Sequence, residues 1–175
     1  LKEFLGRKKI HHDVRMQEPQ AGVVTGLAWT SAGGEILFIE TSRTKGEGKV
    51  QITGQLGDVM KESVQIALTL VKSMFPEEAE TLNESDIHIH VPAGAVPKDG
   101  PSAGITIVTA LTSMLKEKGI SPEYAMTGEV SLRGGVMPIG GLPEKLMAAQ
   151  RAGIRTVFIP YENREDLEDV ADEVK

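Results

Sequence analysis

The sequence predicts an α/β or α+β domain with small mixed sheets and three to four helices. Its 175 residues fit a single domain, and 40% hydrophobic and 25% charged residues are ordinary for a globular protein. β-rich runs bounded by glycine turns alternate with segments whose apolar residues recur every three to four positions. The chain has no Cys, which excludes disulfides, thiol nucleophiles and cysteine-ligated metals. No apolar run approaches the ~20 residues that cross a membrane.

The first part of the chain predicts a linker followed by three strands. Residues 1–20 lack sustained periodicity, so we expect a linker there and a folded domain over residues 21–175. Residues 23–30 and 35–40 are β-rich runs on either side of a Ser-Ala-Gly-Gly turn, which predicts a hairpin. Residues 49–53 form a further candidate strand.

The middle of the chain predicts two helices with a strand between them. Apolar residues from 58 to 75 follow a helical period, and we expect Pro76 to end this helix. Residues 87–91 alternate strictly, which predicts a strand with both histidines on one face. A second helix is predicted over residues 102–118, with Gly119 as its C-terminal stop.

The last part of the chain predicts two strands and two helices. Residues 125–132 are strand-like and are followed by glycine-rich turns. A helix begins at Pro143, a favourable first-turn residue, and ends at Gly153. Residues 156–159 form the last predicted strand, and the acidic stretch 162–173 has the spacing of an exposed amphipathic helix.

The net charge and the first residues of the chain indicate which partners to expect and whether the domain is part of a longer protein. The formal net charge of −6 argues against a nucleic-acid partner, because phosphates favour a basic surface. The basic cluster at residues 7–9 is interpreted as part of a solvated linker. The chain begins with neither Met nor an apolar leader, so we expect a piece of a longer intracellular protein, without a membrane partner.

Two kinds of ligand site are weak candidates. His88 and His90 could share a zinc ion, but a third ligand would have to be an acid or one of His11 and His12. Two packed, hydrogen-bonded imidazoles are the alternative that we favour. The Gly-Glu-Gly-Lys stretch at 46–49 lacks the Ser/Thr and the spacing of a phosphate-binding loop. We therefore expect no cofactor and no metal in this chain.

Ser102 is the first candidate for chemistry. It stands in the turn-rich stretch 97–104, which contains two Pro and opens onto a helix. One interpretation is structural, since a serine at this place can cap the helix through its hydroxyl. The other is catalytic, because free N–H groups and the positive end of a helix beside a hydroxyl can form an oxyanion site next to a nucleophile.

Lys145 is the candidate base for such a nucleophile. Its own helix face carries Leu142, Ala148, Ala149 and Ala152, so its amine is expected to be partly desolvated. Desolvation disfavours the ammonium and lowers a lysine pKa toward neutrality. The alternative is a lysine that extends from a half-buried helix into solvent.

The sequence resembles the proteolytic domain of Lon, the ATP-dependent serine protease of peptidase family S16. The resemblance covers more than three-quarters of the chain. Its most specific motifs are Pro-Lys-Asp-Gly-Pro-Ser-Ala-Gly and Gly-Gly-Leu-Pro-Glu-Lys. The matching stretches are residues 25–30, 39–41, 53–63, 88–92, 97–104, 126–129 and 140–145.

The resemblance implies the Lon protease domain fold, which is ribosomal protein S5 domain 2-like, and a serine endopeptidase with a Ser–Lys dyad. It implies that Ser102 is the nucleophile and Lys145 the base. It also implies that Thr127 hydrogen-bonds this lysine, and that Asp99 belongs to a loop that gates the site. In an occluded state of this loop we expect Asp99 to pair with Lys145. The implied cleft-lining residues are His88, His90 and Glu40.

The resemblance also implies the context of the domain. The substrates would be unfolded or damaged proteins and peptides, and an upstream AAA+ ATPase with ATP and Mg would drive proteolysis in a hexameric homo-oligomer. Residues 1–20 would be the remnant of that ATPase, and the C-terminal end would be truncated. Bacterial cytoplasm is the expected location and the mitochondrial matrix the alternative. A different hypothesis is a catalytically silent assembly or binding module with the same fold.

Overall fold

A computed structural model describes residues 18–30, 33–93 and 96–175 of the chain. Most of the predicted linker, including His11 and His12, and the first two residues of the predicted hairpin turn lie outside the described residues. The elements, in chain order, are β1 (Val23–Thr30), β2 (Gly33–Lys45), β3 (Val50–Thr53), α2 (Asp58–Met74), α3 (Pro76–Thr81), η2 (Leu82–Glu84), β4 (Ser85–His90), α4 (Gly104–Lys116), β5 (Tyr124–Met126), β6 (Glu129–Val130), β7 (Val136–Met137), α5 (Leu142–Arg151), β8 (Thr156–Phe158) and η3 (Tyr161–Asp169).

The strands form two sheets, so the predicted mixed α/β class is confirmed. The larger sheet has the strand order β3-β4-β2-β1-β5-β8. Its β1–β2 and β2–β4 pairs are antiparallel, whereas the β3–β4, β1–β5 and β5–β8 pairs are parallel. The small sheet pairs β6 with β7. None of the helices within the described ranges is long and apolar enough to cross a membrane.

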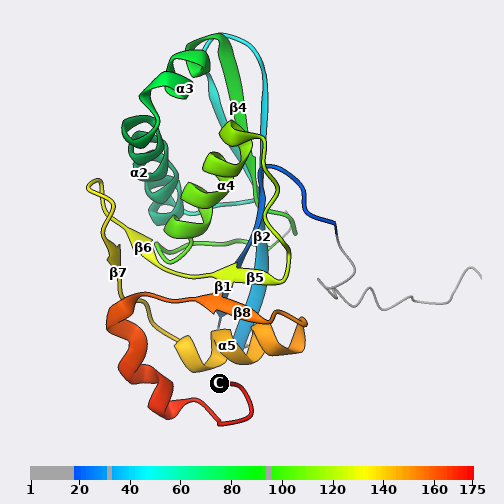
Figure 1. The fold of residues 1–175 in the computed structure, drawn as a ribbon, viewed down its shortest axis with the longest axis vertical. Coiled ribbons are helices and arrows are strands. Elements are labelled where there is room, and N and C mark those ends of the chain that lie inside the picture. Colours follow the sequence, from blue (N-terminus) through cyan, green and yellow to red (C-terminus); the bar gives the residue numbers. More distant parts are fainter. Residues whose placement is uncertain (1–17, 31–32, 94–95) are drawn as a thin grey trace, which may run out of the picture.

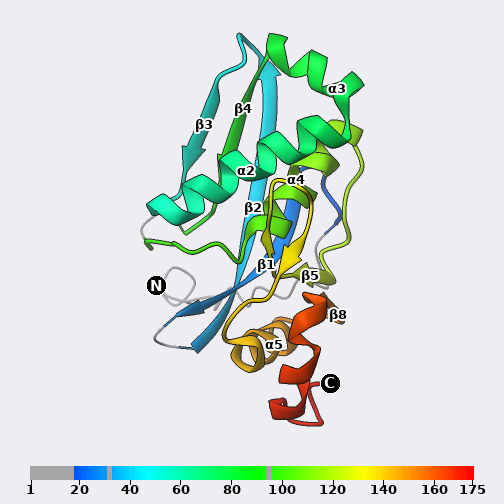
Figure 2. The same ribbon diagram turned by 90° about the vertical axis from the view of Figure 1, so that its left-hand side faces the viewer.

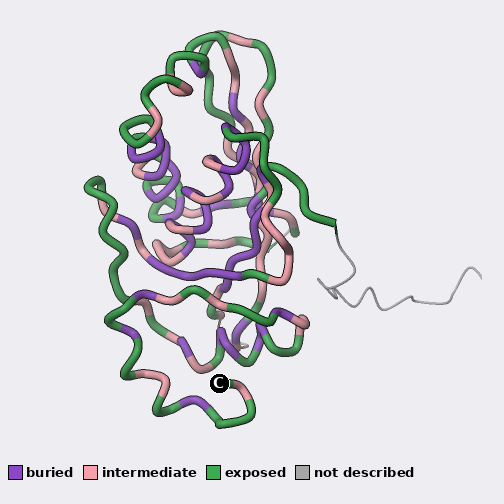
Figure 3. The backbone as a smooth tube through the Cα atoms, in the orientation of Figure 1, coloured by how far each residue is buried: buried purple, intermediate pink, exposed green. Residues whose placement is uncertain are grey.

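The helices lie on opposite faces of the larger sheet. Alternate side chains of β2 point to these two faces and pack against the helices on each. Leu37 and Ile39 face the main core, which holds α2 and α4, whereas Ile36 and Phe38 pack against the cluster that contains Ala149 of α5. Figures 1 and 2 show α2 and α4 together over the upper sheet and α5 near its lower end. The buried residues are divided in the same way, with one group in α2, α4 and the sheet and another in α5 (Figure 3).

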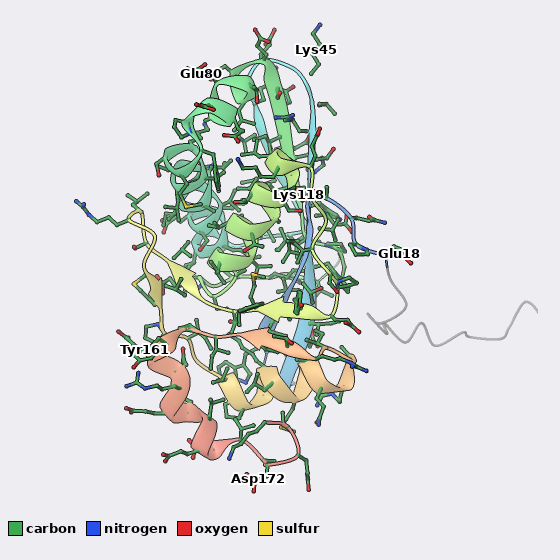
Figure 4. The ribbon with its side chains drawn as sticks, in the orientation of Figure 1. Glu18, Lys45, Glu80, Lys118, Tyr161 and Asp172 are labelled. Atoms are coloured by element: carbon green, nitrogen blue, oxygen red, sulfur yellow. The ribbon has the colours of Figure 1, made fainter. Side chains whose placement is uncertain are left out.

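Charged side chains surround these cores. Glu80 and Asp172, for example, project from opposite ends of the molecule (Figure 4). This distribution agrees with helices such as α2 and α5, which bury one apolar face and leave the other to solvent.

Several predicted boundaries were wrong. The predicted strand 125–132 is two strands in different sheets, β5 and β6. Pro76 does not only end α2; it begins α3 at the first helical position, where its missing N–H costs nothing. The second predicted helix starts at Gly104 rather than at Ser102, and it ends at Glu117 in a left-handed conformation rather than at Gly119. Strand β7 was not predicted.

The acidic C-terminal stretch also differs from the prediction. It forms the 3-10 helix η3 rather than an amphipathic α-helix. Leu167 and Val170 nevertheless pack into a small cluster with Leu142 and Leu146 of α5. The apolar spacing therefore identified the buried side chains, although not the helix type.

Candidate active site

A cavity of about 590 Å³ brings together segments that are distant in the sequence. Its walls come from β1 and β2, from residues 96–103 and from residues 138–140. Ser102 and Lys145 both line it. Most of the other lining side chains are apolar, so the cavity offers an extended ligand a largely apolar surface with a few polar groups.

Ser102 lies in the turn that leads into α4, half-buried and open to this cavity. The N-cap of α4 is Ala103, and no side chain caps this helix. The structural interpretation of Ser102 as a helix cap was therefore wrong. In the described part of the chain, the N–H groups of Ser102 and Ala103 have no acceptor, because the first bonds of this turn begin at Gly104.

Lys145 lies in the second turn of α5 and is only 2% exposed. It does not extend into solvent, so the alternative interpretation of this residue was wrong. Its helix neighbours Ala148 and Ala149 are also buried, as the small residues predicted. Burial disfavours the ammonium and lowers the pKa of Lys145 to about 8. About half of the molecules would then carry a neutral amine near pH 8.

Thr127 and Gly128 connect the serine to the lysine. They follow β5, at the carboxyl end of a parallel part of the sheet. Thr127 Oγ1 accepts a hydrogen bond of 3.3 Å from Lys145 Nζ. The N–H of Gly128 donates to the carbonyl of Ser102 at 2.8 Å, and its own carbonyl accepts from Ile105 at 3.0 Å. This dipeptide therefore fixes both the base and the turn of the nucleophile.

Ser102 and Lys145, both described, are not hydrogen-bonded to each other in this structure. The amine donates to Thr127 instead, while the serine hydroxyl stays open to the shared cavity. Catalytic hydrogen bonds are often long without substrate and shorten in the reacting complex. The arrangement is that of a buried amine of lowered pKa that shares a cavity with an uncommitted hydroxyl.

Asp99 does not pair with Lys145 in this structure, and its pairing in an occluded state of the loop stays a prediction. Its Oδ1 accepts a hydrogen bond of 2.8 Å from the N–H of Met60 in the first turn of α2. That bond, with others from Gly100 and Val59, holds the pKa of the Asp99 carboxyl below its usual value. Asp99 lines the same cavity, but its carboxylate is engaged by a helix N-terminus that has no side-chain cap of its own.

His88, His90 and Glu40 are not among the residues that line the cavity, in contrast to the cleft-lining role that the resemblance implied. Both imidazoles contact Thr53 Oγ1 at 2.7 Å, through His88 Nε2 and His90 Nδ1. Glu40 pairs with His90 in the register of β2 and β4 and lines a separate depression beside Ile120. Within the described ranges, no three His, Asp or Glu side chains gather as metal ligands.

The turn with the faint phosphate-loop pattern is already occupied by a carboxylate. Asp86 Oδ1 accepts hydrogen bonds of 2.9 Å from the N–H groups of Glu47 and Lys49. These bonds lower the pKa of the Asp86 carboxyl. A nucleotide phosphate would have to displace this side chain, so the described residues do not fit an ATP site here.

Asn163 is a residue of the site region that sequence reasoning missed. It is 2% exposed and lies in η3. Its Oδ1 accepts from the N–H of Ile139 at 2.9 Å, and its Nδ2 donates to the carbonyl of the same residue at 2.8 Å. Ile139 lines the cavity, so Asn163 holds one of its walls. The only local indication was a polar residue within the apolar spacing of the C-terminal stretch.

Comparison with protein families matches residues 1–175 to the family described as Lon protease (S16) C-terminal proteolytic domain. Among curated proteins, the chain is 58% identical over 175 residues to a Lon protease of Clostridium beijerinckii and 54% identical over 177 residues to one of Methanosarcina barkeri. Each match covers 100% of this chain. A third, covering 98%, is 54% identical to Lon protease 4 of Sorangium cellulosum. The chain spans 22% of the length of each of these relatives.

Proposed function

The chain belongs to the family of Lon (S16) proteolytic domains, and from this premise we propose that it hydrolyses peptide bonds in protein substrates through a Ser102–Lys145 dyad. The observation that carries the proposal is the burial of Lys145, whose pKa of about 8 makes a neutral amine available. Ser102 opens into the same cavity and caps no helix, so its hydroxyl is available as the nucleophile.

The reaction follows from these two groups. As Ser102 Oγ bonds to the substrate carbonyl carbon, its proton passes to the neutral Lys145 amine. The resulting ammonium returns the proton to the leaving amine when the C–N bond breaks, which leaves an acyl ester on Ser102. Water then attacks this ester and gives a proton to Lys145, and the ammonium protonates Ser102 as the acid product departs.

Backbone groups near the dyad are suited to two further needs of the reaction, stabilisation of the oxyanion and binding of the substrate. We propose that the N–H groups of Ser102 and Ala103, which have no backbone acceptor in the described structure, stabilise the oxyanion of the tetrahedral intermediate. The pairing of β1 with β5 stops at Gly26, so the next residues of β1, which line the cavity, offer a strand edge. We propose that the substrate binds there in an extended conformation, with main-chain hydrogen bonds to this edge.

The context of the domain belongs to the same proposal. Because the chain spans only 22% of its relatives, an ATPase elsewhere in the full protein would bind ATP and Mg. It would unfold damaged proteins and deliver them to this cavity, and the assembly would be a hexameric homo-oligomer. The relatives are bacterial and archaeal, and of the two we propose a bacterial cytoplasmic location.

The test is cleavage of a fluorogenic peptide by the parent and by Ser102→Ala and Lys145→Ala. We expect each variant to lose nearly all activity, because nucleophile and base act as one unit and their losses do not add. Ser73→Ala, which removes a hydroxyl bonded only to its own helix α2, serves as the control. Activity in folded Ser102→Ala would contradict the dyad. An inactive parent would favour the silent assembly module instead.

A further inference from the structure

The side chain of Lys98, four residues before Ser102, is enclosed by backbone carbonyls. Its Nζ donates to the carbonyl oxygens of Ala93 at 2.7 Å, Val96 at 2.8 Å and Gly54 at 2.9 Å. An ammonium has three N–H donors, so all of them are used. Within the described ranges, no carboxylate lies within ion-pair distance of Lys98, so carbonyl dipoles alone stabilise its charge.

The backbone of Lys98 anchors the same segment. Its N–H donates to the carbonyl of Gln55 at 3.0 Å, and its carbonyl accepts from Gly57 at 2.7 Å. These bonds form a parallel bridge between Lys98 and Leu56, between the end of β3 and the start of α2. The turn that carries Ser102 is therefore attached to the sheet–helix junction at Lys98.

Two of the residues bound by Lys98 hold strained conformations. Gln55 has φ of 55° and Ala93 has φ of 63°, both in the left-handed region that non-glycine residues avoid. A non-glycine residue keeps such a conformation only where the surrounding contacts stabilise it enough to offset its cost. The main-chain N–H of Lys98 binds the first residue and its ammonium binds the second, so one side chain and its backbone hold both in place.

We propose that Lys98 is a positioning residue for the dyad: its three carbonyl bonds fix residues 96–102 and so hold the serine hydroxyl in the cavity. Lys98 lines the cavity, but its three N–H donors are all bound by backbone carbonyls, so it acts on the dyad through this segment rather than on the reacting atoms. This inference rests on the proposed peptidase function for its kinetic consequence, whereas the anchoring itself is independent of that function.

The absence of cysteine from the chain allows a chemical rescue experiment. In Lys98→Cys the donors are lost, and alkylation with 2-bromoethylamine then restores an ammonium on a side chain of nearly the same length. We expect the unmodified variant to lose about 10²-fold in kcat with little change in KM, because a misplaced nucleophile slows chemistry more than binding. Alkylation should restore most of kcat.

The matched control is Lys72→Cys, since Lys72 is an exposed lysine of α2 with no hydrogen bond or ion pair in the described structure. It should match the parent before and after alkylation. Amide hydrogen exchange supplies a readout independent of catalysis. In unmodified Lys98→Cys, the amides of Gly57 and Met60 should lose protection, while those of the β1–β2 pair keep it.

The outcomes separate the two proposals. If unmodified Lys98→Cys keeps the kcat and the amide-exchange protection of the parent, the positioning role is overturned. The role is also overturned if the alkylated variant folds but regains neither kcat nor this protection. Activity in Ser102→Ala, or an inactive parent, would overturn the proposed dyad, while the exchange measurement would still decide whether Lys98 anchors this segment.

Discussion

At the scale of single residues, burial determines what Lys145 can do. The amine is almost completely removed from water, and its hydrogen-bond acceptor is the neutral Thr127 hydroxyl. Among the described residues no carboxylate is bonded to it, and Asp99 is engaged by α2. Desolvation without a counter-charge favours the neutral amine, which is the form that a general base requires.

The pH dependence of catalysis should show this titration. Because the neutral amine is the active form, kcat/KM should rise with pH through an apparent pKa of about 8. Thr127→Val removes the oxygen that accepts a hydrogen bond from the ammonium, so the rise of kcat/KM with pH should occur at lower pH. The value of kcat should fall, because the amine loses the bond that holds it in place. Thr112→Val, which removes a hydroxyl bonded within α4, should keep the parent profile. A Thr127→Val profile that overlays the parent would show that this hydrogen bond does not contribute to the pKa of Lys145.

The same burial should destabilise the fold. The pKa of Lys145 falls from 10.5 to about 8 on folding, so between these values the unfolded chain binds more protons and stability rises with pH. Below pH ~8 the cost is fully present and amounts to about 3 kcal/mol. The free energy of unfolding of Lys145→Met, measured with urea, should therefore exceed that of the parent at pH 7 by up to this cost. The difference should be smaller at pH 10. A less stable Met variant at pH 7 would contradict this account.

At the scale of elements, the N-terminus of α2 is capped by another part of the chain. Gly57 at the N-cap position offers no side chain, and the Asp99 carboxylate accepts the N–H of Met60 instead. The loop before Ser102 and the first turn of α2 therefore stabilise each other. The alternation of β2 likewise separates the helices, with α4 packed on one face of the sheet and Ala149 of α5 on the other.

Replacing Asp99 should test this cap. Asp99→Ala should lower Tm at pH 7, whereas Asp99→Asn keeps an oxygen acceptor and should lower it less. Because the folded pKa of Asp99 is depressed, its contribution is present above the usual pKa of ~3.9 and is lost as pH falls through the folded value. The difference in Tm between the parent and Asp99→Ala should therefore close in acid. Higher peptidase activity in Asp99→Asn would instead indicate pairing with Lys145.

At the scale of the whole molecule, the dyad is assembled from two regions with separate cores. Ser102 precedes α4, which belongs to the large cluster, whereas Lys145 lies in α5 between the two smaller ones. Thr127 and Gly128 cross this division, and Asn163 holds the cavity wall in the lower region. Motion between the regions would change the distance between nucleophile and base.

Asn163→Ala should loosen the lower region without unfolding the upper one. It removes the partners that Asn163 supplies to the N–H and carbonyl of Ile139, and because these groups are only partly buried the cost should be below the ~1–3 kcal/mol of a fully buried group. Amide exchange should accelerate in α5 and at Ile139 while α4 keeps its protection, and KM should rise because Ile139 lines the cavity. Asn83→Ala, at an exposed position in η2, is the control. Uniform acceleration across both regions would contradict separate cores.

The local pattern of the sequence determined the hairpin, helices α2 and α5, and the strand with His88 and His90 on one face. Periodicity and turn residues act over a few neighbours, so these elements need little tertiary information. The motifs around Ser102 and Lys145 also identified both candidate groups. Even the small residues Ala148 and Ala149 correctly indicated that the lysine face is buried.

Only the tertiary structure decided which polar groups meet. Lys145 became fully buried, Asp99 was bound by Met60 rather than by Lys145, and His88, His90 and Glu40 were placed outside the cavity. The ladder pairs of β5 with β1 and β8 end at Met126, and the Thr127 N–H still donates to the carbonyl of Phe158, so the Thr127 side chain and the Gly128 N–H follow the strand end and join the dyad. Hydrogen bonds and desolvation depend on atoms brought together from distant parts of the chain, and the spacing of residues along a sequence does not contain those distances.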